Sequence, residues 1–440
     1  MEEEFHNHMQ IPWHDYTKKS IGHPITEASL GEKASIIGRT GIMLLSCGTG
    51  AWRVRSSMNT LARELGITCT ADIGLLSIEY TCIDGGNCYS ESLCLFNTGV
   101  NTSKLYRMEQ FVNRFGTNCK KMSGDELHTL LDEIHEIHGF YSPGFLGVAA
   151  AVACCAFTFL LGGGPVEMLC AFLGAGAGNY LRAKMNQHHL TLFLCTAASV
   201  ALACIVYTIA FYGLESFLSV STQHQAGYIC SMLFIIPGFP FITSGIDLAK
   251  LDMRSGLERL TYAIIIIAVA TLSAWMLALV LHLKPMDFLP LELSQTQKLF
   301  FRLIASFFGV LGFSIMFNSP LKLAATAGII GAIANTTRLE LVDLAAFPPA
   351  AAAFVGALLA GLLASMIKDS IGYPRISLTV PSIVIMVPGL YLYRAIYNIG
   401  ITSIDTGAFW FTEAMLIIMA LPLGLIFARI ITDRTFRHCS

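Results

Sequence analysis

The sequence has little charge for its length. Of its 440 residues, 13% are charged and 54% are hydrophobic, whereas soluble globular proteins carry about 25% charged residues. This shortage excludes an ordinary soluble enzyme, a disordered protein and a coiled coil. The formal net charge is −2, so no basic surface for nucleic acid is expected.

Several motifs of catalytic and metal sites are also missing. The 13 cysteines include no Cys-x-x-Cys pair, the spacing typical of zinc ribbons and redox sites. No GxxxxGK[ST] loop is present, which excludes a nucleotide-driven pump within this chain. The absence of HExxH and GxSxG motifs weakens the case for an intramembrane hydrolase. We therefore predict no cofactor.

One cluster has the residue types of a metal site. His128, Asp132, His135 and His138 follow one another at spacings of four, three and three residues, which places them on one face of a helix. A solvated polar face is the favoured interpretation, because the surrounding segment is rich in acidic residues. We therefore predict no metal.

The charge that is present is unevenly distributed. Residues 1–140 contain 12 basic and 17 acidic residues, whereas residues 141–440 contain 16 and 13. A polar N-terminal part is thus followed by an apolar part more than twice as long. The start of the chain contains no apolar run of signal-peptide length, so we expect the N-terminal part to be cytosolic and its six cysteines between Cys47 and Cys119 to be reduced.

The polar part is expected to be a flexible leader over residues 1–28 and a small α+β domain over residues 29–140. Ser123 and Glu126 have the spacing of a helix capping box. Asp84 to Asn87 reads Asp-Gly-Gly-Asn, which is typical of a hairpin turn. Apolar periodicity predicts helices beginning near residues 30, 54 and 123, and strands over 73–82 and 92–96.

The apolar part contains about ten segments long enough to cross a bilayer, which takes about 20 apolar residues each. The two near 165 and 320 are short and rich in Gly and Ala. The candidate spans are 144–162, 165–182, 190–213, 227–247, 260–282, 299–317, 320–335, 345–366, 380–399 and 408–431. If both termini lie inside, twelve Lys and Arg residues flank the inner ends and four the outer ends, as expected from the positive-inside rule.

The apolar part also repeats itself. Ile236-Pro237-Gly238 recurs as Val387-Pro388-Gly389, and Gly256 recurs as Gly407, all at an offset of 151 residues. The simplest interpretation is two five-span repeats, over 141–283 and 299–440, joined by an external linker over 284–298. Because five is odd, the second repeat must enter the membrane inverted, an arrangement typical of secondary transporters.

Breaks within two of the spans predict a substrate site. Proline and glycine loosen a helix, and unwound backbone survives in a membrane only where protein or a wet cavity surrounds it. Simple kinks at packing crossings are the alternative. The candidate substrate-binding residues are the break residues and the polar residues that follow them: Pro237, Gly238, Asp247, Pro388, Gly389, Arg394 and Asn398.

Two further groups of residues are candidates for function. Glu167 and Glu413 are acidic residues within spans, where a charge is costly and a functional role is the default hypothesis; both could carry protons, or reach the interface of the membrane. The loops after the breaks hold candidate gating residues, for which topology anchors are the alternative: Arg254, Gly256, Arg259 and Gly407.

The residues quoted above resemble those of the threonine/serine exporter family. Gly41 to Gly66 resembles its N-terminal signature, although Arg55 stands where the family has Glu. The stretch from Ile236 to Leu260 resembles its Pro-Gly…Asp…Ser-Gly…Arg signature, and Pro388-Gly389 resembles the shorter one in the second half.

This resemblance implies a multi-pass protein of the cell membrane that exports threonine and serine and is driven by the proton gradient. Export of a dicarboxylate such as succinate is one alternative, since some relatives are assigned to it. A membrane-anchored hydrolase acting through the N-terminal domain is another. The expected partners are a small-molecule substrate, protons and the lipid bilayer, with a homo-oligomer left open.

Overall fold

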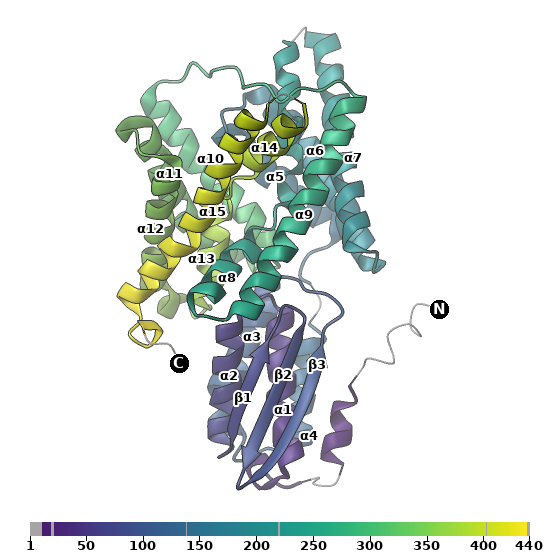
Figure 1. Cartoon of the computed structure of the whole chain (residues 1–440), viewed down its shortest axis with the longest axis vertical. Helices are drawn as coiled ribbons and strands as arrows, with labels where there is room; N and C mark the ends of the chain where they lie inside the picture. Colours follow the sequence, from purple (N-terminus) through teal and green to yellow (C-terminus); the bar gives the residue numbers. More distant parts are fainter. Residues whose placement is uncertain (1–10, 19–21, 138, 219–220, 402, 438–440) are drawn as a thin grey trace. The chain divides into compact units, whose positions relative to one another are not determined.

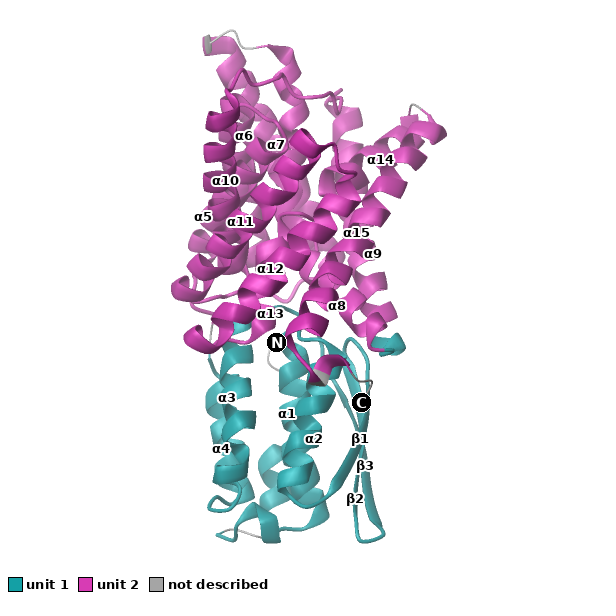
Figure 2. Cartoon of the chain, turned by 90° about the vertical axis from the view of Figure 1, so that its left-hand side faces the viewer, with its two compact units in different colours: residues 1–138, 251–255 teal, residues 139–250, 256–440 magenta. Residues whose placement is uncertain are grey.

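The computed structural model describes residues 11–18, 22–137, 139–218, 221–401 and 403–437. The chain divides into two compact units, coloured separately in Figure 2. Unit 1 comprises residues 1–138 together with Leu251–Ser255, and unit 2 comprises Gly139–Lys250 and Gly256–Ser440. Each unit is described by itself.

Unit 1 is an α+β fold in which helices cover a small sheet. Its sheet has the order β1-β2-β3, and both pairs of neighbours are antiparallel. Helices α1 and α2 pack against the sheet, and α3 and α4 pack on α1, as Figure 2 shows. Its elements are η2 (Trp13–Thr17), η3 (Ile25–Glu27), α1 (Leu30–Ser46), α2 (Ala51–Glu64), β1 (Thr68–Ile73), β2 (Ser77–Asp84), β3 (Asn87–Cys94), α3 (Thr102–Asn118) and α4 (Gly124–His135).

Local signals explain where several of these elements begin and end. The predicted capping box at the start of α4 is confirmed: Glu126 N–H bonds to the Ser123 hydroxyl, and the Glu126 carboxylate accepts from Ser123 N–H. The predicted turn is confirmed as well. Gly85 and Gly86 both have positive φ, which the tight hairpin between β2 and β3 requires.

The structure differs from the sequence-based expectation in three places within unit 1. Strand β1 and helix α3 were not predicted. The leader was expected to be flexible, yet η2 packs on α1 and α4 and η3 packs on α1, with Thr17 and Ile25 buried. Residues 1–10 and 19–21 of that leader lie outside the described residues.

Unit 2 is helical, and the same order of elements occurs in it twice. Three long helices are followed by a broken pair and a further long helix (Figure 1). In chain order these are α5 (Pro143–Leu160), α6 (Pro165–Gln187), α7 (Leu192–Leu218), η4 (Thr222–Ile235) with α8 (Gly238–Ala249), α9 (Met253–Val280), α10 (Gln295–Met316), α11 (Leu321–Ala345), α12 (Pro349–Ile371), α13 (Arg375–Val384) with α14 (Gly389–Ile401), and α15 (Ile404–Thr432), after which η5 (Thr435–Arg437) ends the described chain.

Six helices of the described chain are long and apolar enough to cross a membrane, and the two broken pairs bring the number to eight. Helices α6 and α11 are long as well, but they fall outside that set. They are the two Gly- and Ala-rich segments near residues 165 and 320. Unit 2 is therefore a polytopic membrane unit, and the count of ten spans stays a prediction.

Both breaks predicted from the Pro-Gly pairs are present. The chain bends by 55° between η4 and α8, at Pro237, and by 46° between α13 and α14, at Val387-Pro388. Pro388 has no N–H to donate, which interrupts the helical ladder.

The two breaks pack against each other in a reciprocal way. A Cβ added at Gly238 would meet Val384 and Val387, and one added at Gly389 would meet Ile236 and Leu233. Leu233 and Ile236 precede Val384 and Val387 by the offset that also separates the two glycines. Such an exchange of equivalent contacts is what a two-fold relation produces. It supports inverted repeats, which stay a prediction beyond this crossing.

The equivalent glycines after the breaks also occupy equivalent environments. A Cβ at Gly256 would meet Leu248 of α8, and one at Gly407 would meet Ile399 of α14. The residues of these two contacts are again related by the repeat offset. Each glycine lets a long helix turn back closely along the short helix before it, so both positions have a packing role.

We predict that Gly389→Ala destabilises unit 2, because its methyl group would overlap Ile236 at the crossing. Overpacking of this kind costs about 1–3 kcal/mol. Thermal unfolding of the detergent-solubilised chain would measure the loss. Gly213→Ala is the matched control, because a Cβ at Gly213 in α7 meets nothing within 4 Å. Equal stability of the two variants would contradict the close crossing.

Candidate functional site

A cavity of about 650 Å³ opens beside the break between α13 and α14. The break contributes the chain from Ile385 to Tyr391. The other walls come from the end of α5, from α10, α11 and α15, and from residues 287–293 of the segment between α9 and α10. The expected linker therefore forms part of the cavity wall. The volume lies within the range of small-molecule sites, about 300–1,000 Å³.

Charged side chains gather on one wall of this cavity. Lys298 and Arg302 of α10 both contact the Asp343 carboxylate at 2.6 Å. Arg302 also pairs with Glu340, just outside the lining, at 2.7 Å. Arg302 thus has two carboxylate partners, which offsets the cost of its burial.

Arg394 forms a second charged wall. Its guanidinium pairs with Asp287 at 2.8 Å and lies 4.9 Å from the centre of the Trp410 ring, a cation–π arrangement. The Asp287 side chain is 90% exposed. Because Asp287 is so exposed, this ion pair contributes little, as surface ion pairs generally do. Arg394 also lines the cavity, so an anion in the cavity can reach it.

Arg338 differs from the other cations of the cavity. It lines the cavity from α11, and unlike Lys298, Arg302 and Arg394 it has no carboxylate partner in the described part of the chain. Its Nε atom is buried without a hydrogen bond, as is that of Arg394. A guanidinium offers a planar fork that matches a carboxylate. Arg338 is therefore the cation of this cavity best placed to bind a substrate carboxylate.

The break also presents backbone groups to the cavity. The carbonyls of Ile385 and Met386, which follow the end of α13, accept no backbone hydrogen bond in the described chain. Helix C-termini favour cations and helix N-termini favour anions. The end of α13 and the start of α14 thus carry opposite partial charges, as do the broken ends of discontinuous helices in transporters.

The structure brings only some of the predicted substrate residues together. Pro388, Gly389 and Arg394 line the cavity. Asn398 lies one turn beyond Arg394, and its amide donates to the Arg394 carbonyl at 2.7 Å. Pro237 and Gly238 lie outside the lining, and Gly238 packs behind it on Val387.

Asp247 and Arg259 also lie outside the cavity, as a buried pair. The Asp247 carboxylate contacts Arg259 Nε at 3.2 Å, and the side chains of Arg259 and Asp247 are 2% and 0% exposed. Removing one partner would leave the other charge buried, at a cost of about 3–5 kcal/mol. In this structure their contact joins α8 to α9.

The two predicted proton carriers have different surroundings. Glu167 is 1% exposed and pairs with His224 Nδ1 at 2.6 Å, while its other oxygen accepts from Gly164 N–H at 2.9 Å. Glu413 is half-buried in α15, between Trp410 and Ile417, which line the cavity. His224 was not singled out from the sequence.

The candidate gating residue Arg254 belongs to unit 1. It contacts Asp72 and Glu79, on strands β1 and β2, at 2.5 and 3.1 Å. Gly256 and Gly407 have the packing roles described above.

Two family models match this chain. The ThrE model, described as "Putative threonine/serine exporter", matches residues 35–282, and the ThrE_2 model, described as "Threonine/Serine exporter, ThrE", matches residues 302–431. The chain belongs to the threonine/serine exporter family. The resemblance read from the sequence is thereby confirmed.

Two curated proteins are similar to this member of the exporter family. The "Probable threonine/serine exporter" of Mycobacterium tuberculosis is 22% identical over 401 residues, which cover 88% of this chain and 74% of that protein. The "Probable succinate transporter subunit YjjP" of Escherichia coli is 24% identical over 244 residues, which cover 53% of this chain and 91% of that protein. No solved structure matches the chain.

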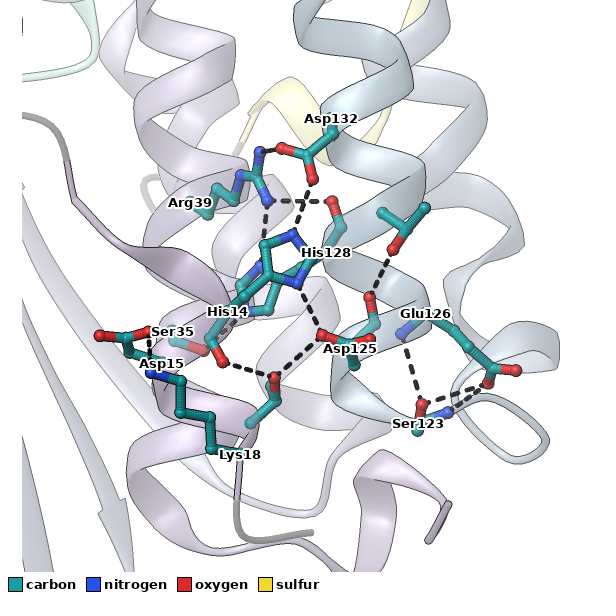
Figure 3. Close-up of polar contacts among 12 residues, drawn as sticks. His14, Asp15, Lys18, Ser35, Arg39, Ser123, Asp125, Glu126, His128 and Asp132 are labelled. Carbon is teal, nitrogen blue, oxygen red and sulfur yellow. Dashed lines mark hydrogen bonds and ion pairs between the residues drawn. The ribbon is translucent and has the colours of Figure 1, made fainter. Parts of the chain in front are cut away.

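A second polar cluster lies within unit 1 of this exporter (Figure 3). His14 of η2 bridges two carboxylates of α4, Asp125 at 2.6 Å and Asp132 at 2.8 Å. Asp132 also pairs with Arg39 of α1. The described residues contain no group of His, Cys, Asp and Glu side chains arranged to hold a metal; His138 lies outside them.

The pKa values of the two histidines in this cluster, His14 and His128, shift in opposite directions. Hydrogen bonds to Asp125 and Asp132 raise the pKa of His14 above its ordinary value. Burial, and then the charge of Arg39, lower the pKa of His128 to about 3. His128 is therefore neutral in the folded unit, with its Nε2 3.0 Å from the Ser35 hydroxyl.

We predict that His14 fastens η2 to α4 in a pH-dependent way. Because folding raises its pKa, its stabilisation is complete below about pH 6.5, the unfolded value, and is lost as pH rises through the folded value. His14→Gln should therefore speed hydrogen exchange in α4 at pH 5.5 by up to about fivefold, since exposed ion pairs contribute at most about 1 kcal/mol.

At pH 8.5 the exchange rates of the variant and the unmodified chain should converge. Taking their ratio at each pH cancels the intrinsic pH dependence of exchange. His23→Gln, an exposed histidine of the same segment, serves as the control. A larger effect of His14→Gln at pH 8.5 than at pH 5.5 would show that the stabilisation by His14 changes with pH in the opposite direction.

Proposed function

We propose that this chain is a proton-coupled secondary transporter that exports small polar amino acids, threonine or serine, across the cell membrane, with both termini in the cytoplasm. The observation that carries the proposal is the cavity guanidinium of Arg338, which has no carboxylate partner in the described chain. Family membership supports a transporter. The distribution of Lys and Arg supports the orientation.

The cavity has complementary groups for both ends of an amino acid. The carboxylate would bind Arg338 and lie near the N-terminus of α14. The ammonium would bind the carbonyls of Ile385 and Met386 at the end of α13. Such a site selects a zwitterion, because each substrate charge meets its opposite and neither buried group stays unpaired.

The proton would be carried by Glu167 or Glu413. Glu167 is the stronger candidate, because it is buried and has a histidine as hydrogen-bond partner. Uptake of a proton by the Glu167–His224 pair would change the net charge of that pair within unit 2. Glu413 lies on α15, between two residues that line the cavity.

A dicarboxylate such as succinate is the second candidate substrate. Arg394 is the observation in its favour, because its partner Asp287 is almost fully exposed and a second substrate carboxylate could replace it. The name of the similar protein from Escherichia coli, "Probable succinate transporter subunit YjjP", points the same way.

Substrate binding should depend on Arg338. In proteoliposomes with the full chain, Arg338→Gln should raise the KM for threonine or serine by about 10- to 100-fold, since hydrogen bonds between charged groups contribute about 1.5–3 kcal/mol. The KM of Arg338→Lys should lie between that of the unmodified chain and that of Arg338→Gln. Lys322→Gln, an exposed cation on the same helix, is the control and should behave as the unmodified chain.

The binding assay also separates the candidate substrates. Flux of succinate alone would move the proposal to dicarboxylates. Absence of flux for all three substrates, with folded protein, would refute export by this chain.

Coupling to the proton gradient should depend on Glu167. Glu167→Gln should abolish the response to an imposed pH gradient while leaving exchange of substrate for substrate intact, because exchange needs no net proton movement. Glu215→Gln, a half-buried acid in α7, is the control. If Glu167→Gln stays coupled and Glu413→Gln does not, Glu413 is the carrier. Normal coupling in both variants would refute the proton role of these residues.

A further inference from the structure

The cavity arginine has an equivalent in the first repeat. Arg338 follows Asn335 by three residues, and Arg182 follows Asn179 by three residues. The Asn179 amide donates to the Leu146 carbonyl of α5 at 2.8 Å, and the Asn335 amide donates to Ser306 of α10 at 2.9 Å. Each asparagine thus bonds to the preceding helix of its own repeat, which aligns α6 with α11.

Contacts with the broken segments give nearly the same alignment. A Cβ at Gly174 of α6 would meet Ser231 of η4, and one at Gly331 of α11 would meet Ser382 of α13. Ser231 and Ser382 are separated by the same offset as the residues at the crossing of the two breaks. Gly174 and Gly331 are 157 residues apart and Asn179 and Asn335 are 156 apart, so Arg182 and Arg338 occupy similar places in α6 and α11 to within one residue.

These equivalent places lie at opposite ends of unit 2. Gly162, just before α6, lines the cavity, so α6 begins at the cavity end. Arg182 lies about 25 Å along the helix from Pro165, at a rise of about 1.5 Å per residue. Arg338 lies in the last third of α11, at the cavity. Helices α6 and α11 thus run in opposite directions with respect to the cavity.

Arg182 shares a second property with Arg338. It has no hydrogen bond or ion pair among the residues that the structure describes. The titratable side chains that act on its charge are Tyr262 of α9 and Cys195 of α7, and neither is a carboxylate. A cation within a membrane segment is costly and pairs with an anion where one is available.

We propose that Arg182 binds the carboxylate of the transported substrate when the site faces the opposite side of the membrane, as Arg338 does in the state seen here. This inference rests on the proposed function. The reciprocal crossing of the two breaks provides the physical basis, because exchanging the conformations of two equivalent repeats would close the cavity at Arg338 and open its equivalent at Arg182. The ligand class is a small carboxylate.

The test measures the KM separately on the two faces of the membrane. The full chain is reconstituted at one copy per vesicle, and vesicles of one orientation are isolated by capture on a C-terminal tag. Exchange of labelled serine or threonine then gives the external and internal KM. Arg182→Gln should raise the KM at one face by about tenfold or more, and Arg338→Gln should do so at the other face. Arg182→Lys should be intermediate.

Lys184→Gln is the matched control, because Lys184 is an exposed cation two residues further along α6. Equal changes at both faces for Arg182→Gln, or a fall in maximal rate with both KM values unchanged, would mean a structural role and overturn the inference. Absence of exchange by the unmodified chain would instead refute the proposed function. A melting temperature close to that of the unmodified chain shows that a variant is folded.

Discussion

The close crossing of two broken helices is the constraint on which the membrane unit depends. Gly238 and Gly389 lie where each break meets the hydrophobic side chains of the other, and neither position has room for a Cβ. Because the contacts are exchanged between equivalent residues, the crossing relates the two repeats as well as packing them. It lies where α13 ends and α14 begins, and the residues of this break line the cavity.

Charge pairing is the reason that we propose this cavity, and not the other candidate residues, as the substrate site. Two buried arginines of unit 2 are neutralised: Arg259 by Asp247, and Arg302 by Glu340 and Asp343. Buried pairs of this kind are weak evidence for function, since they offset their own desolvation. Arg338 has no such partner in the described chain, and that difference distinguishes a binding residue from a structural one.

The parts of the fold that follow from local chemistry could be predicted from the sequence. Proline and glycine mark both breaks, their shared offset predicts that they are equivalent, and Ser123 with Glu126 predicts the start of α4. Strand β1 was not predicted, because its apolar residues are few and its position follows from pairing with β2. Helix α3 was not predicted either, although Leu105, Met108 and Phe115 belong to a buried apolar stripe at helical spacing that the sequence already shows.

The cavity arginine could not be singled out in the same way. By its local sequence Arg338 resembles a cation at the end of a span that only orients the chain in the membrane, since nothing nearby distinguishes it from Lys298. The burial of its Nε atom and its lack of a carboxylate partner in the described chain depend on how α10 and α11 pack. The spacing of Arg338 from Asn335, repeated at Asn179 and Arg182, is the signal in the sequence that could have identified it.

In the proposed site, a substrate carboxylate binds Arg338 beside crossed, equivalent helix breaks. Cryo-electron microscopy of the full chain in nanodiscs, with and without L-serine or L-threonine, would locate the ligand and show how the breaks pack. We expect ligand density between the Arg338 guanidinium and the α13–α14 break, with Gly238 and Gly389 packed against the opposite break. Ligand bound away from Arg338, or breaks that do not touch, would contradict this site.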